Sequence, residues 1–214
     1  MIFLDCETLD FFQDDHIKSL PRAEQLAAIR FGIAVTYNDQ ADEWLEWTLD
    51  QLPDLWAYLR YSHSDAPIAG WNIIDFDWPV IRNNVARFGD AILYHGRQPE
   101  LDDLFQRIKA KTGRWYKLEL VAQTNLGRGK SADGQQAAEW LREWHDNGDQ
   151  SALRKALDYC RLDVELERDL FLHLAKRPLR LPPRPERGEL NEILYYVDGT
   201  TERIPDATGA ISTK

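Results

Sequence analysis

Short apolar runs separated by turn residues predict the strands of this chain. Each run has the length of a buried strand, and most end in residues that favour turns. The first run is followed directly by acidic residues. The expected strands are Ile2 to Leu4, Phe31 to Tyr37, Trp44 to Leu49, Ala66 to Trp71 and Ala91 to Tyr94.

Apolar residues at helical spacing predict the helices. Asp77-Trp78-Pro79 opens one of them, since aspartate is a good N-cap and proline is tolerated in the first turn. Strands come mostly first and helices follow, so we expect an α/β fold in which helices cover a mixed sheet. The other helices are expected at Pro21 to Ile29, Leu52 to Tyr61, Asp102 to Thr112, Leu118 onward, Gln135 to Trp144 and Ser151 to Lys176.

The tail differs from the rest of the chain in composition. Four of the ten prolines fall within residues 178–185, interleaved with arginines, which excludes a helix and predicts an extended linker or strap. Beyond it, Leu190 to Val197 and Thr201 to Ile204 flank Asp198-Gly199, a pattern typical of a β-hairpin. We therefore expect a domain over residues 1–175 and a Pro/Arg-rich C-terminal extension over residues 176–214.

Composition narrows the class of protein. Of the 214 residues, 43% are apolar and 29% charged, and no apolar run approaches the roughly 20 residues of a membrane helix. The N-terminal run is too short for a signal peptide and two cysteines build no disulfide framework, so we expect a reducing, cytoplasmic location and no membrane partner. The net charge of −10 argues against holding nucleic acid by bulk positive charge. It indicates either a solvated acidic surface or an acidic metal site.

Two carboxylates, Asp5 and Glu7, stand one residue apart at the end of the first strand. Side chains two residues apart on a strand leave the same face, so Cys6 points the other way. Crowding two carboxylates at a buried strand end is costly unless a cation binds them, and Mg²⁺ and Mn²⁺ prefer oxygen ligands. The spacing by itself is equally typical of a solvated strand end.

Two further motifs carry acids. Residues 72–77 span a strand-to-helix junction, where Asp77 either caps the next helix or reaches a metal, and Asn72 is also a typical turn residue. Tyr159 and Asp163 are four residues apart on one helix and therefore share a face. Taken alone, this pair is equally typical of a core tyrosine and an aspartate paired with an arginine.

In this order, the three motifs resemble those of the DEDD superfamily of 3′–5′ exonucleases, which have a ribonuclease-H-like fold. A tyrosine four residues before the last aspartate is typical of the DEDDy branch. The second motif is similar to that of family-B DNA polymerase proofreading domains and of stand-alone bacterial ribonuclease-H-like exonucleases. The resemblance covers residues 1–175 and departs in the long connection from Leu9 to Arg30. The matching segments are Leu4-Asp5-Cys6-Glu7-Thr8, Gly70-Trp71-Asn72 through Phe76-Asp77, and Tyr159 through Asp163.

The resemblance implies a two-metal-ion 3′–5′ exonuclease that releases nucleoside 5′-monophosphates from single-stranded DNA or RNA. Tyr159 would orient the attacking water or the scissile phosphate, because a tyrosine hydroxyl with its usual pKa of about 10 is a poor base. We assign the ligand role to Asp77 rather than to Asp75, because Phe76-Asp77 matches the Phe-Asp pair of the family motif. Four carboxylates would hold the two divalent cations, Mg²⁺ or Mn²⁺: Asp5, Glu7, Asp77 and Asp163.

Substrate contacts are expected in two places. By the resemblance, Thr8, Leu9 and Asn72 lie at the terminal nucleotide, although Thr8 is equally an ordinary strand-end residue. Residues 107–130 carry seven Lys or Arg against one Glu, with two aromatic residues between them. Such a stretch tracks phosphates and stacks bases, or forms a solvated helix face beside a buried tryptophan. The substrate contacts expected from it are Lys111, Arg114, Trp115 and Lys117.

Two other functions remain open at this stage. A non-catalytic nucleic-acid-binding or partner-docking module of the same fold would carry similar motifs, and so would a structure-specific endonuclease. The sequence contains no identifiable reader of the 2′-hydroxyl group, so it does not separate DNA from RNA. It leaves the oligomeric state, the protein partners and the pathway open as well.

Overall fold

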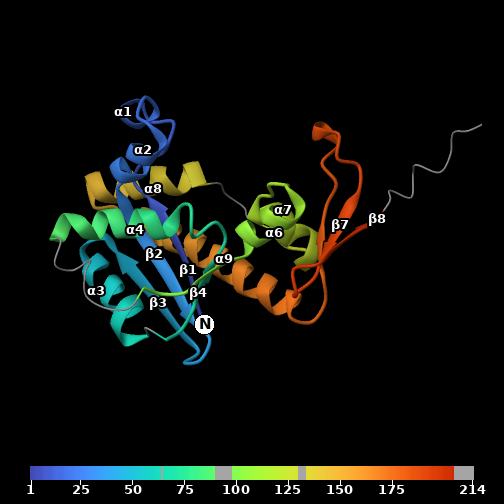
Figure 1. The fold of residues 1–214 in the computed structure, drawn as a ribbon. Helices are drawn as coiled ribbons and strands as arrows, with labels where there is room; N and C mark the ends of the chain where they lie inside the picture. Colours follow the sequence, from blue (N-terminus) through green and yellow to red (C-terminus); the bar gives the residue numbers. More distant parts are fainter. Residues whose placement is uncertain (64, 90–97, 130–133, 205–214) are drawn as a thin grey trace, which may run out of the picture. The chain divides into compact units, whose positions relative to one another are not determined.

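The computed structural model describes residues 1–63, 65–89, 98–129 and 134–204 (Figure 1). The chain divides into two compact units, each built from two separate stretches of sequence. Unit 1 comprises Met1–Asp103 and Lys130–Glu165, and unit 2 comprises Leu104–Gly129 and Leu166–Lys214. The boundary expected at residue 175 rests on the change in composition at the tail and on the extent of the family resemblance, and it stays a prediction.

Five strands form the sheet of unit 1: β1 (Ile2–Thr8), β2 (Phe31–Asn38), β3 (Glu43–Thr48), β4 (Ile68–Gly70) and β5 (Leu101–Asp103). Their order is β3-β2-β1-β4-β5. β1 pairs antiparallel with β2 and parallel with β4, while β3 extends the antiparallel side and β5 the parallel side. β1 is therefore the central strand of a mixed sheet, as expected.

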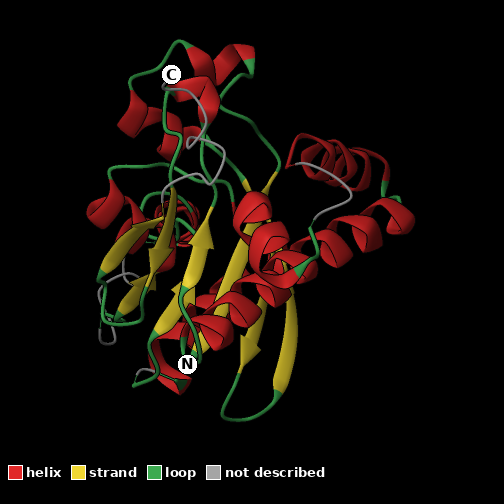
Figure 2. Cartoon of the chain, turned by 90° about the vertical axis from the view of Figure 1, so that its right-hand side faces the viewer, coloured by secondary structure: helices red, strands yellow, loops and turns green. Residues whose placement is uncertain are grey.

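Helices connect and cover these strands (Figure 2). Two 3-10 turns, Leu49–Gln51 and Ala86–Phe88, and a π turn at Tyr58–Ser62 adjoin them. Within the described ranges, no helix combines the length and the apolarity that a membrane span needs. The α-helices of this unit are α1 (Asp15–Lys18), α2 (Arg22–Ala28), α3 (Leu52–Ala57), α4 (Asp77–Val85), α8 (Gly134–Asn147) and the first part of α9 (Gln150–Leu174).

Side chains of β1 alternate between two differently covered faces. Ile2, Leu4 and Cys6 are buried in the main apolar core, which they share with residues of α3 and α4. Trp56 of α3 stacks on Trp78 of α4 in this core, with ring centroids 5.1 Å apart. Asp5 and Glu7 leave the other face, where α8 and α9 lie behind the sheet as drawn in Figure 1.

Most predicted elements of unit 1 are confirmed; the differences concern β5, the end of α3 and the four-residue helix α1, which the sequence did not predict. The strand β5 was not predicted, because its three residues include two aspartates, which are poor strand formers; the helix expected from Asp102 begins only at Leu104. Pairing with β4 makes these residues a strand. The helix predicted to Tyr61 changes to a π turn after Ala57. The strand predicted at Ala91 to Tyr94 lies outside the described residues.

Unit 2 contains two short helices, part of α9 and a three-stranded antiparallel sheet. The helices are α6 (Leu104–Thr112) and α7 (Leu118–Leu126), and the strands, in sheet order, are β6 (Leu179–Leu181), β7 (Glu192–Tyr195) and β8 (Thr201–Ile204). β7 and β8 form a hairpin at the predicted residues, with Gly199 at a φ of 80° in its turn. The proline-rich segment adds β6 to this hairpin and continues into a 3-10 turn at Pro185–Arg187.

The long connection after β1 is closed by an ion pair between the buried Asp10 and the more exposed Arg30. Asp10 is 2% exposed, and its carboxylate accepts hydrogen bonds from the backbone N–H and from Nε and Nη2 of Arg30, at 2.9, 2.8 and 2.7 Å. The backbone N–H of Leu9 also donates to the carbonyl of Arg30 at 3.0 Å. The segment between them, which contains α1 and α2, therefore leaves and rejoins the sheet at one point.

Gly70 allows β4 to lie close to β1. A Cβ atom at this position would lie 2.9 Å from the carbonyl oxygen of Leu4 and 3.2 Å from Cβ of Ile73. We expect Gly70→Ala to lower the free energy of unfolding by about 1–3 kcal/mol, because neither contact is with a flexible side-chain end. Urea denaturation measures this. At Gly134, where a Cβ would meet open space, Gly134→Ala is the control and should not destabilise; equal losses for both variants would contradict the prediction.

The Asp10 ion pair should make stability depend on pH. Burial raises the pKa of the Asp10 carboxyl, but the hydrogen bonds and charge of Arg30 outweigh burial and leave the pKa below its ordinary value of 3.8. Its contribution is therefore present above that value and is lost as the pH falls through the lowered folded pKa. We expect Asp10→Asn to lower the free energy of unfolding by about 1–3 kcal/mol at pH 7, and this difference should shrink below about pH 4.

Denaturation series between pH 3 and pH 7 measure the effect. Asp15→Asn is the control, because Asp15 pairs with Lys18 on the surface and is 93% exposed. Surface pairs contribute little to stability. A loss in the Asp10→Asn variant that is independent of pH would argue against the ion pair as its cause.

Candidate metal centre

The central strand carries the first two candidate ligands. Asp5 and Glu7 are half-buried, and each alternates with a side chain of the main core. Backbone pairing holds both residues in register, because Asp5 lies opposite Val35 and Glu7 opposite Ile33 on β2. The predicted common face for the two acids is therefore present.

The helix α9 brings a third carboxylate to this face. Asp163 is 3% exposed, and one oxygen each of Asp5, Glu7 and Asp163 lie within 4.8 Å of one another. Tyr159 is also buried and lies one helical turn before Asp163. Two predicted motifs more than 150 residues apart in the sequence thus meet at one place.

The chemistry of this donor set fits a divalent cation. Three carboxylates so close together, one of them almost wholly buried, repel one another unless a cation or protons offset their charge. Carboxylate oxygens suit Mg²⁺ and Mn²⁺, whereas zinc sites usually contain histidine or cysteine ligands, which this group lacks. The residues present therefore fit an oxygen-bound divalent metal.

Asp77 connects α4 to the same strand. The helix begins at Asp77, its N-cap is Phe76, and no side chain caps it. Instead, the buried Asp77 carboxylate accepts a hydrogen bond of 3.1 Å from the backbone N–H of Cys6, between the two acids of β1. The capping role considered for Asp77 is thus not what the structure shows, and its carboxylate lies against the strand that carries the metal-binding group.

Burial is the main influence on the pKa of Asp77 and of the two thiols near β1. Burial raises the pKa of Asp77 to about 7; hydrogen bonds from Cys6 oppose the rise and the negative charge of Asp103 adds to it. Burial also raises the pKa of the Cys6 and Cys160 thiols well above their usual range, with the nearby carboxylates adding to the effect.

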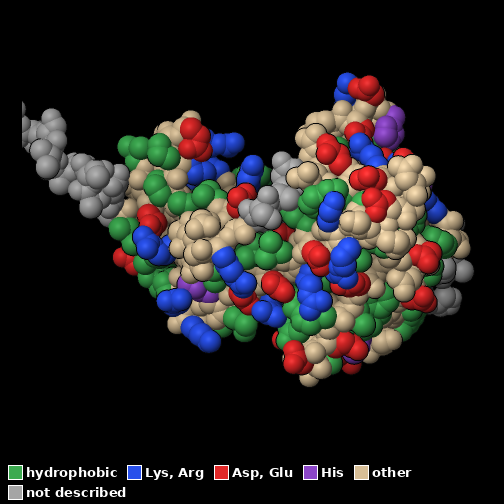
Figure 3. Space-filling model, turned by 180° about the vertical axis from the view of Figure 1, so that it is seen from behind, with side chains coloured by type: hydrophobic (Ala, Val, Ile, Leu, Met, Phe, Trp, Pro, Cys, Tyr) green, Lys and Arg blue, Asp and Glu red, His purple; other side chains and the backbone are tan. Residues whose placement is uncertain are grey.

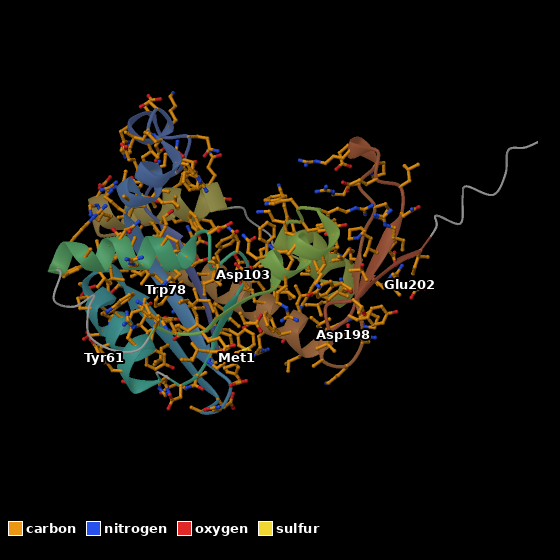
Figure 4. All side chains as sticks on the ribbon, in the orientation of Figure 1. Met1, Tyr61, Trp78, Asp103, Asp198 and Glu202 are labelled. Carbon is orange, nitrogen blue, oxygen red and sulfur yellow. The ribbon has the colours of Figure 1, made fainter. Side chains whose placement is uncertain are left out.

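Asp103 is a site residue that the sequence did not indicate. It ends β5, is 2% exposed, and accepts hydrogen bonds from the backbone N–H groups of Asn72 and Ile74 at 3.1 and 3.0 Å (labelled in Figure 4). Asn72 has a φ of 68°, in the left-handed region that asparagine adopts more readily than most residues. Asp103 thus holds the turn that leads into Asp77. In the sequence, Asp103 looks like any acidic residue at the start of a helix, so no signal indicated its role.

The two cysteines are buried and free. The Cys160 thiol donates a hydrogen bond of 3.3 Å to the carbonyl oxygen of Asp5, so it ties α9 to the backbone of β1. Cys6 contributes its backbone N–H to Asp77 and its side chain to the core. Both positions agree with the expectation of reduced, packed thiols.

The predicted nucleotide contacts of unit 1 lie next to the carboxylates in sequence but differ in exposure. The Thr8 hydroxyl donates to the carbonyl oxygen of Asp10 at 2.8 Å, and Leu9 is 1% exposed, so both serve the fold. Asn72 is half-buried in its strained turn. Asp75, the alternative to Asp77, is exposed. The nucleotide contacts predicted for Thr8, Leu9 and Asn72 stay predictions.

The predicted contacts of unit 2 divide into buried and exposed residues. Arg114 is 8% exposed, and its guanidinium binds Glu189 and the carbonyl oxygen of Asn191 within unit 2. It therefore serves the packing of this unit. Lys111, Trp115 and Lys117 are exposed.

A comparison with known families gives the site its context. Residues 2–175 match the RNase H superfamily, and the chain belongs to this superfamily. Its members are typically metal-dependent nucleases. The protein therefore has a nuclease-type fold, which is the fold of hydrolases that act on nucleic acids. The expected ribonuclease-H-like fold is thereby confirmed. None of the curated proteins matches the chain.

Metal binding should stabilise the protein through the converging carboxylates. In protein freed of metal, adding Mn²⁺ or Mg²⁺ should raise the thermal midpoint, with about 2.7 kcal/mol of stabilisation at a hundredfold excess over Kd. Asp5→Asn and Asp163→Asn should abolish most of this rise, because each removes a ligand charge. Without metal, the same variants should be as stable as the wild type or more stable, because repulsion is relieved.

Asp158→Asn is the matched control, since Asp158 lies on the same helix but is exposed and pairs with Arg154. Differential scanning fluorimetry measures all four proteins. A metal response that survives in Asp163→Asn, or that is lost in Asp158→Asn, would count against the site described here.

Proposed function

We propose that this protein is a metal-dependent 3′–5′ exonuclease of the DEDDy type that shortens single-stranded nucleic acid and releases nucleoside 5′-monophosphates. The observation that carries the proposal is the approach of Asp163 on α9 to Asp5 and Glu7 on β1, within 4.8 Å. Tyr159 lies one turn before Asp163, the spacing of the DEDDy branch. The superfamily assignment supports nuclease chemistry in general.

Four carboxylates would hold two divalent cations. Asp5, Glu7 and Asp163 supply the converging oxygens. Asp77 lies outside the group of three converging oxygens, and we infer from the family resemblance that it would be the fourth ligand; its carboxylate is held by the backbone N–H of Cys6, the residue between the two acids in sequence. When bound, the cations supply Lewis acidity, which acidifies the attacking water and balances the charge that develops on the phosphodiester.

The protein's own groups position the reactants. Asp103 and the turn at Asn72 fix the start of α4 and hence Asp77. Tyr159 offers a hydroxyl beside Asp163, suited to orient the water or the scissile phosphate by a hydrogen bond. Tyr159 and Asp163 are both buried, so their side chains are ordered before the substrate binds.

The proposed reaction is hydrolysis at the last phosphodiester. The water oxygen forms a bond to phosphorus while the bond from phosphorus to the 3′ oxygen of the preceding nucleotide breaks. That oxygen takes up a proton and becomes the new 3′ hydroxyl of the shortened strand. One of the two protons of the water supplies that hydroxyl. The water oxygen and the second proton remain on the phosphate of the released nucleoside 5′-monophosphate, so no further co-reactant is needed.

Digestion of end-labelled oligonucleotides tests the polarity. With Mg²⁺ or Mn²⁺, a 5′-labelled single strand should yield a ladder of shortening products and a 3′-labelled strand should yield labelled mononucleotide first. EDTA should stop both. Asp5→Asn and Asp163→Asn should lower the rate by about 100-fold or more, since a bound cation contributes several kcal/mol to the transition state. Tyr159→Phe should lower it about 10- to 100-fold.

Matched DNA and RNA strands and a closed circular strand complete the experiment. Asp158→Asn, the exposed neighbour on α9, should retain the wild-type rate. Cleavage of the circle would indicate an endonuclease instead. Binding without any metal-dependent shortening would leave a nucleic-acid-binding module, and either result would overturn the proposal.

A further inference from the structure

The two units of the chain differ strongly in charge. Unit 1 carries 12 Lys and Arg against 27 Asp and Glu, a net charge of −15, whereas unit 2 carries 14 against 9, a net charge of +5. Several Lys and Arg side chains lie on the face of unit 2 that Figure 3 turns to the viewer. The overall charge of −10 conceals a basic unit that is suited to a polyanion.

In unit 2, an extended segment joins α6 to α7 and alternates in exposure. Trp115 and Lys117 are exposed. Arg114, which precedes them, and Tyr116, which lies between them, are buried. Lys117 has extended dihedral angles, with φ −77° and ψ 143°. The indole of Trp115 and the ammonium of Lys117 are therefore both open to solvent, on either side of the buried Tyr116 in the chain.

The buried residues fix the segment in place. The Arg114 guanidinium donates to the carbonyl oxygen of Asn191 at 2.9 Å and lies 3.1 Å from the Glu189 carboxylate. Tyr116 donates its hydroxyl hydrogen to the carbonyl oxygen of Pro182 at 3.3 Å. The Trp115 backbone is therefore held firmly on both sides, and binding a ligand there costs little ordering entropy.

The indole itself is oriented but open. Arg184 donates a hydrogen bond to the carbonyl oxygen of Trp115, and the ring of Phe105 meets the indole edge to face with centroids 5.9 Å apart. Even so, Trp115 is 48% exposed. A single exposed apolar residue is ordinary. Here it is unusual because the tryptophan is rigidly held inside a basic stretch.

Cationic groups surround this position along the chain. Lys109 lies over the ring of Phe105, with its ammonium 5.5 Å from the centroid, and Phe105 in turn contacts Trp115. Lys117 follows two residues after Trp115 and is likewise exposed. A planar ring beside ammonium groups matches a ligand with a planar base and a neighbouring phosphate.

We propose that Trp115 and Lys117 of unit 2 bind single-stranded nucleic acid, with the indole stacking on a base and the ammonium contacting an adjoining phosphate. The inference rests on the proposed function in taking a single strand as the substrate, and it adds residues that hold the strand without being metal ligands. A duplex would not serve as well, because its bases are already stacked on one another. Stacking accepts every base, so this contact is independent of sequence.

Binding measured without catalysis tests this inference. Fluorescence anisotropy of a labelled oligothymidine in EDTA reports affinity while cleavage is blocked. Trp115→Leu should raise Kd roughly tenfold or more, the usual effect of losing one stacked base, and Trp115→Phe, which keeps an aromatic ring, should recover most of the affinity. Lys117→Ala should reduce the dependence of log K on log salt by about 0.7, the value for one phosphate contact in a single strand.

Controls separate stacking from general effects. Leu172→Ala removes another exposed apolar side chain of unit 2, which is 52% exposed, and Lys155→Ala removes an exposed lysine of unit 1. Both should bind as the wild type does. An abasic strand of the same length and charge should bind the wild type and Trp115→Leu equally. Thermal melting should show that each variant remains folded.

The outcomes separate this inference from the proposed function. If Trp115→Leu binds the oligothymidine as tightly as the wild type does, or loses as much affinity for the abasic strand, the inference is overturned even where digestion proceeds. If the binding results hold but no metal-dependent shortening occurs, the exonuclease proposal fails and the strand-binding surface stands.

Discussion

The crowding of carboxylates at the centre of the sheet is the constraint on which the structure of unit 1 depends. Asp5 and Glu7 are brought to the same place as Asp163 although like charges repel. Such an arrangement persists only if the backbone around it is held firmly by other interactions. The central position of β1, paired on both sides, supplies the first of these.

Hydrogen bonds from neighbouring elements supply the rest. Cys160 binds the Asp5 carbonyl, Asp77 binds the N–H of Cys6, and Asp103 binds the turn before α4. Each bond joins a different element to the end of β1 or to the junction beside it. The acids are therefore positioned by hydrogen bonds that are already formed within the protein, which is what a pre-organised metal centre requires.

The sequence predicted those features that local pattern determines. Apolar runs located β1, β2, β3 and β4, and spacing placed Asp5 with Glu7 and Tyr159 with Asp163. It did not reveal β5, whose two aspartates form a strand only because β4 lies beside them. Nor did it distinguish Arg114 from its exposed neighbours, since seven basic residues in one stretch look alike until packing buries some of them.

The sequence by itself determined the α/β class and the charge of each segment, because these follow from residue type and short-range spacing. It indicated the candidate ligands through the resemblance of its three motifs to those of a known family. Only the tertiary structure decided that Asp163 meets Asp5, that Asp77 binds a backbone N–H rather than capping its helix, and that Asp103 supports the turn before it. These depend on contacts between residues far apart in the chain. Strand order and helix packing determine such contacts, and local pattern does not encode them.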